Sequence, residues 1–153
     1  LEADLAEAFE RLAPGGTKAD PGCNAKTALA DALARLGSRR EDIFLTGIRT
    51  VQMEPIWGGQ EDAAAPLRAA SALGLAGTRP SDLMSLLADL LADPVPDARL
   101  GAVAAIAAAG DPAGIPLLRL KVRLGDVHPQ LAFDCLSALA RLDPLLCLHR
   151  CAA

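Results

Sequence analysis

Cysteine and histidine are the side chains of this chain best suited to hold a metal ion. The four cysteines stand at positions 23, 135, 147 and 151, and His149 lies between the last two. A thiolate pair with an imidazole is a ligand set that zinc accepts. In a regular helix, however, Cys147 and Cys151 share one face while His149 points nearly the opposite way. We therefore expect free thiols in a reducing compartment, with no metal and no cofactor.

Nucleophilic catalysis is the second chemistry to consider. Cys23 follows Pro21-Gly22 near an expected helix start, where the helix dipole can lower the pKa of a thiol. A cysteine nucleophile also needs a positioned base, and the two histidines, His128 and His149, are distant in sequence. No phosphate-binding glycine loop, His-Glu metal pair or nucleophile elbow occurs in the chain. We therefore expect a protein that is not an enzyme.

A lone tryptophan marks one segment as a candidate binding element. Trp57 lies in the segment 53–60, which also contains Pro55 and the pair Gly58-Gly59. Proline and paired glycines prevent a regular helix there, so we predict a shaped loop. Trp57 is then either an anchor that fills a pocket in a partner or a plug that covers the base of its own loop.

A short repeated pattern identifies the elements that must position these residues. Each copy is a run of small and apolar residues, and the copies end at Gly37, Gly77, Gly110 and Asp143. Their apolar anchors are spaced 40, 33 and 33 residues apart, at Leu33, Leu73, Ile106 and Leu139. At this period one unit is a pair of helices that buries its apolar face only by stacking on its neighbours. We predict an all-α array of stacked antiparallel helix pairs.

The spacing divides the chain, residues 1–153, into units of a single domain. We assign residues 24–52 to the first repeat, 61–92 to the second, 97–124 to the third and 128–150 to the fourth. A helix over residues 1–13 precedes them, and we expect the chain to be a piece of a longer one. The longer first spacing places an inserted loop at residues 53–60, and such insertions often form the binding edge. In the first repeat, Asn24 is the expected N-cap, and Ala25 and Leu33 lie on the expected apolar face.

Residues 93–112 carry a family pattern. They include Asp93-Pro94-Val95-Pro96-Asp97-Ala98-Arg99, then Ala102 to Ile106, then Gly110-Asp111-Pro112. This pattern resembles HEAT-like repeats of the PBS-lyase type, over about residues 24–148. Residues 23–26 and 49–59 are also similar to a family of uncharacterised bacterial HEAT-repeat proteins. The resemblance implies a curved α-solenoid whose second helices line the concave side, and it implies no catalytic activity.

If the second helix of each pair lines the inner surface, its polar residues form the candidate contact surface. Helical spacing groups these residues into a basic, an acidic and a second basic patch. The patches contain, in that order, Arg49 and Gln52; Asp82, Ser85 and Asp89; and Arg119 and Arg123. Alternating charge suits a polypeptide partner of complementary charge. The alternative is that these residues only keep the surface solvated.

Composition and charge favour a protein partner over nucleic acid. Apolar residues make up 52% of the chain and aromatic residues only 3%, so Leu, Ala, Ile and Val must build the core. Fifteen Lys and Arg against 19 Asp and Glu leave a formal charge of −4, which argues against a phosphate-binding surface. No apolar run of about 18 residues occurs, so we expect no membrane insertion. We predict a cytoplasmic, non-catalytic scaffold that binds a protein or peptide on its concave face and inserted loop.

The alternative function is that of a HEAT-like enzyme. The alkylpurine DNA glycosylases resemble this fold and use aromatic and acidic groups in a basic groove, which here would be Trp57 with Asp62 or Glu61. The only compact basic cluster, however, is Arg119 to Arg123. Self-association through the open ends of the array is also expected, with three leucines left uncovered at one end. These are Leu145, Leu146 and Leu148.

Overall fold

A computed structural model describes residues 1–144, which are mostly helical. The helices are α1 (Glu2–Leu12), α2 (Gly16–Ala19), α3 (Asn24–Arg35), α4 (Glu41–Ile48), α5 (Ala65–Thr78), α6 (Leu83–Leu91), α7 (Pro96–Ala109), α8 (Ile115–Leu124) and α9 (Pro129–Leu142). One antiparallel hairpin of β1 (Met53–Ile56) and β2 (Gly59–Asp62) interrupts them. The prediction of an all-helical chain therefore needs one correction, because the expected loop is a small sheet. Since β2 ends at Asp62, the helix of the second unit begins at Ala65 and not near Glu61.

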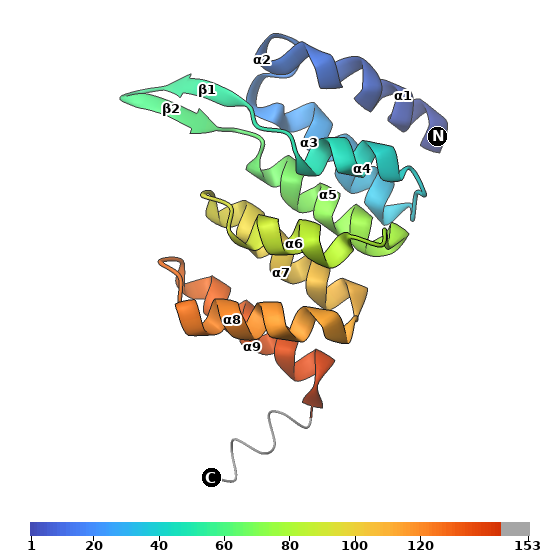
Figure 1. Cartoon of the computed structure of the whole chain (residues 1–153). Coiled ribbons are helices and arrows are strands. Elements are labelled where there is room, and N and C mark those ends of the chain that lie inside the picture. The colour runs from blue at the N-terminus through green and yellow to red at the C-terminus, as the bar shows by residue number, and fades with distance from the viewer. Residues whose placement is uncertain (145–153) are drawn as a thin grey trace.

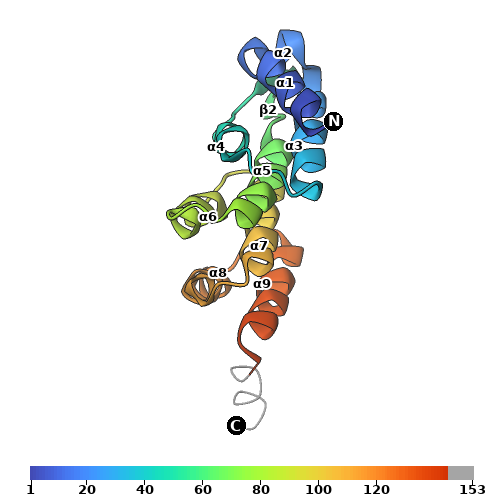
Figure 2. The same cartoon turned by 90° about the vertical axis from the view of Figure 1, so that its right-hand side faces the viewer.

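The helices from α3 onward lie in two layers. Helices α3, α5, α7 and α9 form the first layer and α4, α6 and α8 form the second (Figure 1, Figure 2). Each first-layer helix packs on the next, most extensively α5 on α7. Each second-layer helix packs mainly on the first-layer helix that follows it in the chain: α4 on α5, α6 on α7 and α8 on α9. Grooves therefore remain between the second-layer helices.

Small residues set the close spacing between the helices. A Cβ atom on Gly101 of α7 would lie 2.5 Å from the Cα atom of Ala69 in α5. A Cβ atom on Gly74 of α5 would lie equally close to the ring of Phe44 in α4. Because protein interiors have no spare volume, a larger side chain at either glycine would push the helices apart. No helix within residues 1–144 is long and apolar enough to cross a membrane.

Two buried arginines and their half-buried partners connect the helix pairs at one edge of the stack. The guanidinium group of Arg68 lies 2.7 Å from the carboxylate of Asp62 and 2.8 Å from that of Asp93. Arg99 donates to the carbonyl of Asp93 at 2.8 Å and to the carboxylate of Asp126 at 2.7 Å. We call this run, completed by Lys121 at 2.9 Å from Asp126, the charge ladder. It consists of Asp62, Arg68, Asp93, Arg99, Asp126 and Lys121.

Each aspartate of the ladder also shapes the turn before a first-layer helix. The carboxylates of Asp62, Asp93 and Asp126 accept the backbone N–H two residues further on. These aspartates thus shape the starts of the helices and also bind the cationic side chains of the ladder. Since backbone N–H groups and guanidinium groups share these carboxylates, the turns and the stacking of the pairs depend on one another.

Helix α3 differs from its predicted start and face. It begins at Asn24, but the carboxylate of Asp20, and not Asn24, accepts the N–H groups of Ala25 and Lys26, at 2.9 Å each. The helix buries Lys26 and Leu33, while Ala25 is exposed. The predicted N-cap is therefore wrong, and the predicted apolar face is only partly correct.

The substitution Asp126→Asn tests the ladder. Hydrogen bonds from Arg99 and Lys121 hold the pKa of Asp126 well below its usual range. This lowered pKa contributes stability that is present above the unfolded pKa of about 4 and is lost as the pH falls below it. At pH 7 we expect the variant to lose roughly 2 kcal/mol in urea unfolding. The difference from the native chain should narrow as the pH falls from about 5 to about 2.

Asp42→Asn is the matched control. A hydrogen bond from Arg40 lowers the pKa of Asp42, but this ion pair is exposed at the surface. Solvent screens such pairs, so the loss in unfolding free energy should be much smaller than for Asp126→Asn. Equal losses for the two variants would contradict the role assigned to the ladder.

Two glycine substitutions test the close packing. Gly101→Ala should destabilise the fold by about 1–3 kcal/mol through overlap with Ala69, despite the better helix propensity of alanine. Gly77→Ala, in the same kind of helix but with no atom within 4 Å of the added methyl group, should stabilise it by about 0.5–1 kcal/mol. Thermal unfolding of both variants measures the difference, and the same sign for both would refute the packing argument.

Candidate functional site

The β1–β2 hairpin is the element that extends farthest from the helices (Figure 1). Its register runs from Met53 opposite Asp62 to Ile56 opposite Gly59, so a two-residue turn of Trp57 and Gly58 closes it. Gly58 has a φ of 90°, a value that glycine adopts without steric cost. The two strands pair with each other and have few contacts with the helices. The hairpin is therefore a projecting arm with a defined tip.

Trp57 is fully exposed at this tip, with a relative exposure of 102%. Of the two roles considered from sequence, the plug is therefore wrong, because the side chain covers nothing. Ile56 and Met53 on the same hairpin are also about half exposed, at 50% and 48%. Exposed apolar residues on one projecting element are typical of a binding surface.

A buried glutamine joins the hairpin to the helices. The side-chain amide of Gln52 donates to the carbonyl of Asp20 at 2.8 Å and to the carboxylate of Glu54 at 2.6 Å. Its side-chain oxygen accepts from the ammonium group of Lys26 at 2.6 Å. Gln52 is only 5% exposed, so its predicted place on an outward basic patch is wrong. It lies beyond the end of α4, where helical spacing no longer determines which way a side chain points.

Two further carboxylates fix the root of the arm. Glu54 accepts the N–H of Gly22 at 2.8 Å, and Asp62 accepts the N–H of Gln52 at 3.0 Å. Burial raises the pKa of Asp62, but hydrogen bonds from the N–H groups of Gln52 and Ala64, and from Arg68, outweigh it and hold that pKa below its ordinary value. Asp62 is thus a structural acceptor, and both of its carboxylate oxygens are engaged at the root of the arm.

The remaining candidate residues lie on the second layer and its connections. Six of them are exposed: Arg49, Asp82, Ser85, Asp89, Arg119 and Arg123. Arg49 and Asp89 line the same groove between α4 and α6, with Val51 and Leu90 also on its walls. The structure therefore brings together one residue of each of these two patches, Arg49 and Asp89, whereas Gln52, Asp82 and Ser85 do not line this groove.

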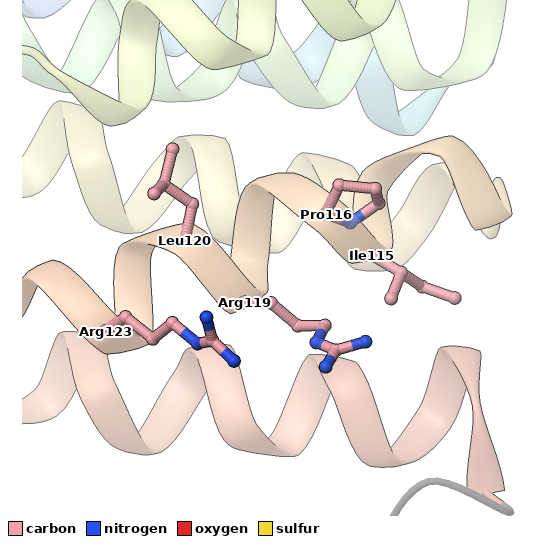
Figure 3. A pocket seen from close by; sticks show the side chains of 5 residues that line it. All are labelled: Ile115, Pro116, Arg119, Leu120 and Arg123. Carbon is pink, nitrogen blue, oxygen red and sulfur yellow. The ribbon is translucent and has the colours of Figure 1, made fainter.

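The second basic patch borders apolar surface on α8. Arg119 and Arg123 line a shallow hollow together with Ile115, Pro116 and Leu120 (Figure 3). The two guanidinium groups lie on the same side of α8 in this view, and neither pairs with a carboxylate within residues 1–144. Leu120 also lines the neighbouring groove between α6 and α8, whose walls are largely leucine and alanine. This patch is suited to a ligand that carries both acidic and apolar groups.

The cysteines offer no activated thiol in the described part of the chain. Cys23 and Cys135 are free and buried. Burial raises the pKa of both thiols, that of Cys135 to about 11, which is the opposite of the lowered value that catalysis at Cys23 would need. Residues 1–144 contain no group of three or more His, Cys, Asp or Glu side chains able to hold a metal ion. Cys147, His149, Cys151 and the three C-terminal leucines lie outside the described residues.

The fluorescence of Trp57 tests the description of the arm. Because Trp57 is the only tryptophan, all tryptophan emission comes from the hairpin tip. We expect acrylamide to quench it nearly as efficiently as it quenches free N-acetyltryptophanamide, with little change in emission when the helices unfold in urea. Quenching several times weaker than that of the free amide would show that the ring is covered and would contradict an exposed anchor.

Comparisons of the chain with models of protein families, with curated proteins and with solved structures found no match. The case for a function therefore depends on the geometry of the arm and of the second layer.

Proposed function

We propose that this chain is an α-solenoid of HEAT-like repeats that acts as a non-catalytic scaffold for a polypeptide partner. In this proposal the helix pairs are the repeats, the second layer is the concave side, and the cytoplasm is the compartment. The observation that carries the proposal is the full exposure of Trp57 at the tip of the hairpin. A large aromatic ring in water is unfavourable, and a partner that buries it gains binding energy.

The hydrogen bonds that attach the arm to the rest of the fold support the same function. Gln52 and Glu54 connect its root to Lys26 of α3 and to the turn before that helix. Asp62 connects it to Arg68 of α5. Little freedom of the root is therefore lost when a partner docks there. A binding anchor gains affinity when the element that carries it is already fixed at its base before the partner binds. The charged residues of the second layer then supply complementarity, which selects among partners and directs their approach more than it adds affinity.

The saturation of Asp62 favours the scaffold over the glycosylase-type alternative. Of the two acidic groups that this alternative could use, Asp62 has both carboxylate oxygens engaged by Arg68 and by backbone N–H groups. Glu61 is exposed on the hairpin opposite Glu54, and not in a basic groove. The formal charge of −4 also weakens attraction to a nucleic-acid backbone.

Affinity capture with matched variants tests the scaffold function. The immobilised native chain and the Trp57→Ala variant are incubated with a lysate of the cells that produce the protein, and the captured proteins are quantified by mass spectrometry. We expect at least one protein to be captured by the native chain and reduced about tenfold or more by Trp57→Ala, as for a hot-spot residue.

Phe133→Ala is the control, because Phe133 is also an exposed aromatic residue, at 65%, but lies on α9. It should leave capture of the same protein unchanged. Arg119→Glu should weaken capture mainly at low salt if the second layer takes part. If Trp57→Ala captures every protein that the native chain captures, the scaffold proposal fails at its central residue.

A further inference from the structure

We propose that the outer edge of β2 binds an extended, basic segment of the partner as an added strand. This inference rests on the proposed function, because it names the class of polypeptide that the arm recognises. It is drawn from the backbone of the hairpin and from one pair of carboxylates, and does not use the exposure of Trp57.

The register of the hairpin determines which backbone groups point outward. With a two-residue turn, the pair next to the turn, Ile56 and Gly59, is the hydrogen-bonded one, and bonded and non-bonded pairs then alternate along the ladder. The N–H and C=O groups of Glu61 therefore point toward β1, whereas those of Gln60 point away from it. No described group outside the hairpin bonds to the backbone of Gln60, so β2 presents an unpaired edge.

The other edge of the hairpin is blocked. Pro55 lies directly opposite Gln60 and occupies the outward-facing position of β1. Proline has no N–H, so it removes the donor that an added strand would need there. The hairpin thus has one edge whose outward N–H is available to an added strand, and strand addition is limited to that side of the arm.

Charge identifies the kind of strand. Glu54 and Glu61 are direct cross-strand neighbours on one face, where like charges repel. Glu54 accepts hydrogen bonds from Gly22 and Gln52, but Glu61 is exposed and has no cationic partner within residues 1–144. A Lys or Arg on an added strand beside Glu61 would relieve this repulsion. A second copy of the hairpin would increase it, so the edge favours a basic partner over self-pairing.

Selection of peptides on the immobilised protein tests the edge directly. A random twelve-residue peptide library serves as the probe, and binders are characterised by fluorescence polarisation. We expect binders of the native chain to be enriched in Lys or Arg alternating with apolar residues. Gln60→Pro, which removes the outward N–H, should weaken them about tenfold, whereas Gln60→Ala, which keeps it, should stay within about twofold.

The folding of the arm must be checked in the proline variant. Because the N–H of Glu61 points toward β1, its slow hydrogen exchange by NMR reports an intact hairpin independently of binding. If this protection is lost in Gln60→Pro, the peptide backbone is tested instead. Binders methylated at single backbone nitrogens on alternate residues should lose affinity at every second position only, and equal losses at all positions would overturn the inference.

Glu61→Lys tests the charge argument. It places a cation opposite Glu54 and should abolish the enrichment of Lys and Arg among the recovered peptides. The apolar residues at every second position of these peptides should remain enriched. An unchanged preference for basic residues would overturn the assignment of Glu61 as the group that selects them.

The outcomes separate this inference from the scaffold function. Binders that need Trp57 but bind Gln60→Pro with an intact arm would support the scaffold and overturn strand addition. Binders that need the N–H of Gln60 and not Trp57 would support strand addition and contradict the role of Trp57 as an anchor. Failure to recover any binder that depends on either residue would contradict both.

Discussion

The charge ladder is the interaction on which the rest of the structure depends. Arg68 and Arg99 each bond to the turn before and the turn after one helix pair. The loss of Asp126 would leave the buried charge of Arg99 without a carboxylate partner among the described residues. Leaving one partner of a buried pair unmatched costs more than the pair itself contributes, because the remaining charge stays desolvated. The ladder therefore specifies how one pair stacks on the next, while the contacts of alanine and glycine supply the close approach that brings the charges within reach.

The arm is an extension of the same network. Asp62 ends β2 and is also the first acidic group of the ladder, so one carboxylate holds both the hairpin root and the next helix pair. On the other side, Gln52 and Glu54 connect the root to the turn before α3. Trp57 and the free edge of β2 thus project from a rigid base, although the strands themselves pack against little. If the tip of the hairpin moved relative to this base, ordering the tip on binding would cost entropy and reduce the affinity for a partner.

The second layer is open because its helices rest mainly on first-layer helices and not on each other. Apolar faces of α4, α6 and α8 are buried toward the first layer. Arg49 and Asp89 line the groove between α4 and α6, and Arg119 lies on the exposed side of α8. Close packing in one layer and open spacing in the other are consequences of residue size. The same distribution of small and large residues that builds the core therefore also makes the candidate surface.

The sequence by itself determined the helix pairs, their order and the place of the insertion, because apolar periodicity, proline and glycine act locally. It also carries a signal for the ladder, since Arg68 and Arg99 each follow an aspartate by six residues. Lys26 follows Asp20 at the same spacing, in the turn and first residues of α3. Only the tertiary structure decided that the insertion is a hairpin, that Trp57 is exposed and that Gln52 is buried. Those outcomes depend on groups far apart in the chain, such as Gly22 with Glu54 and Asp62 with Arg68, and the exposure of a side chain beyond a helix end follows from such contacts and not from its spacing.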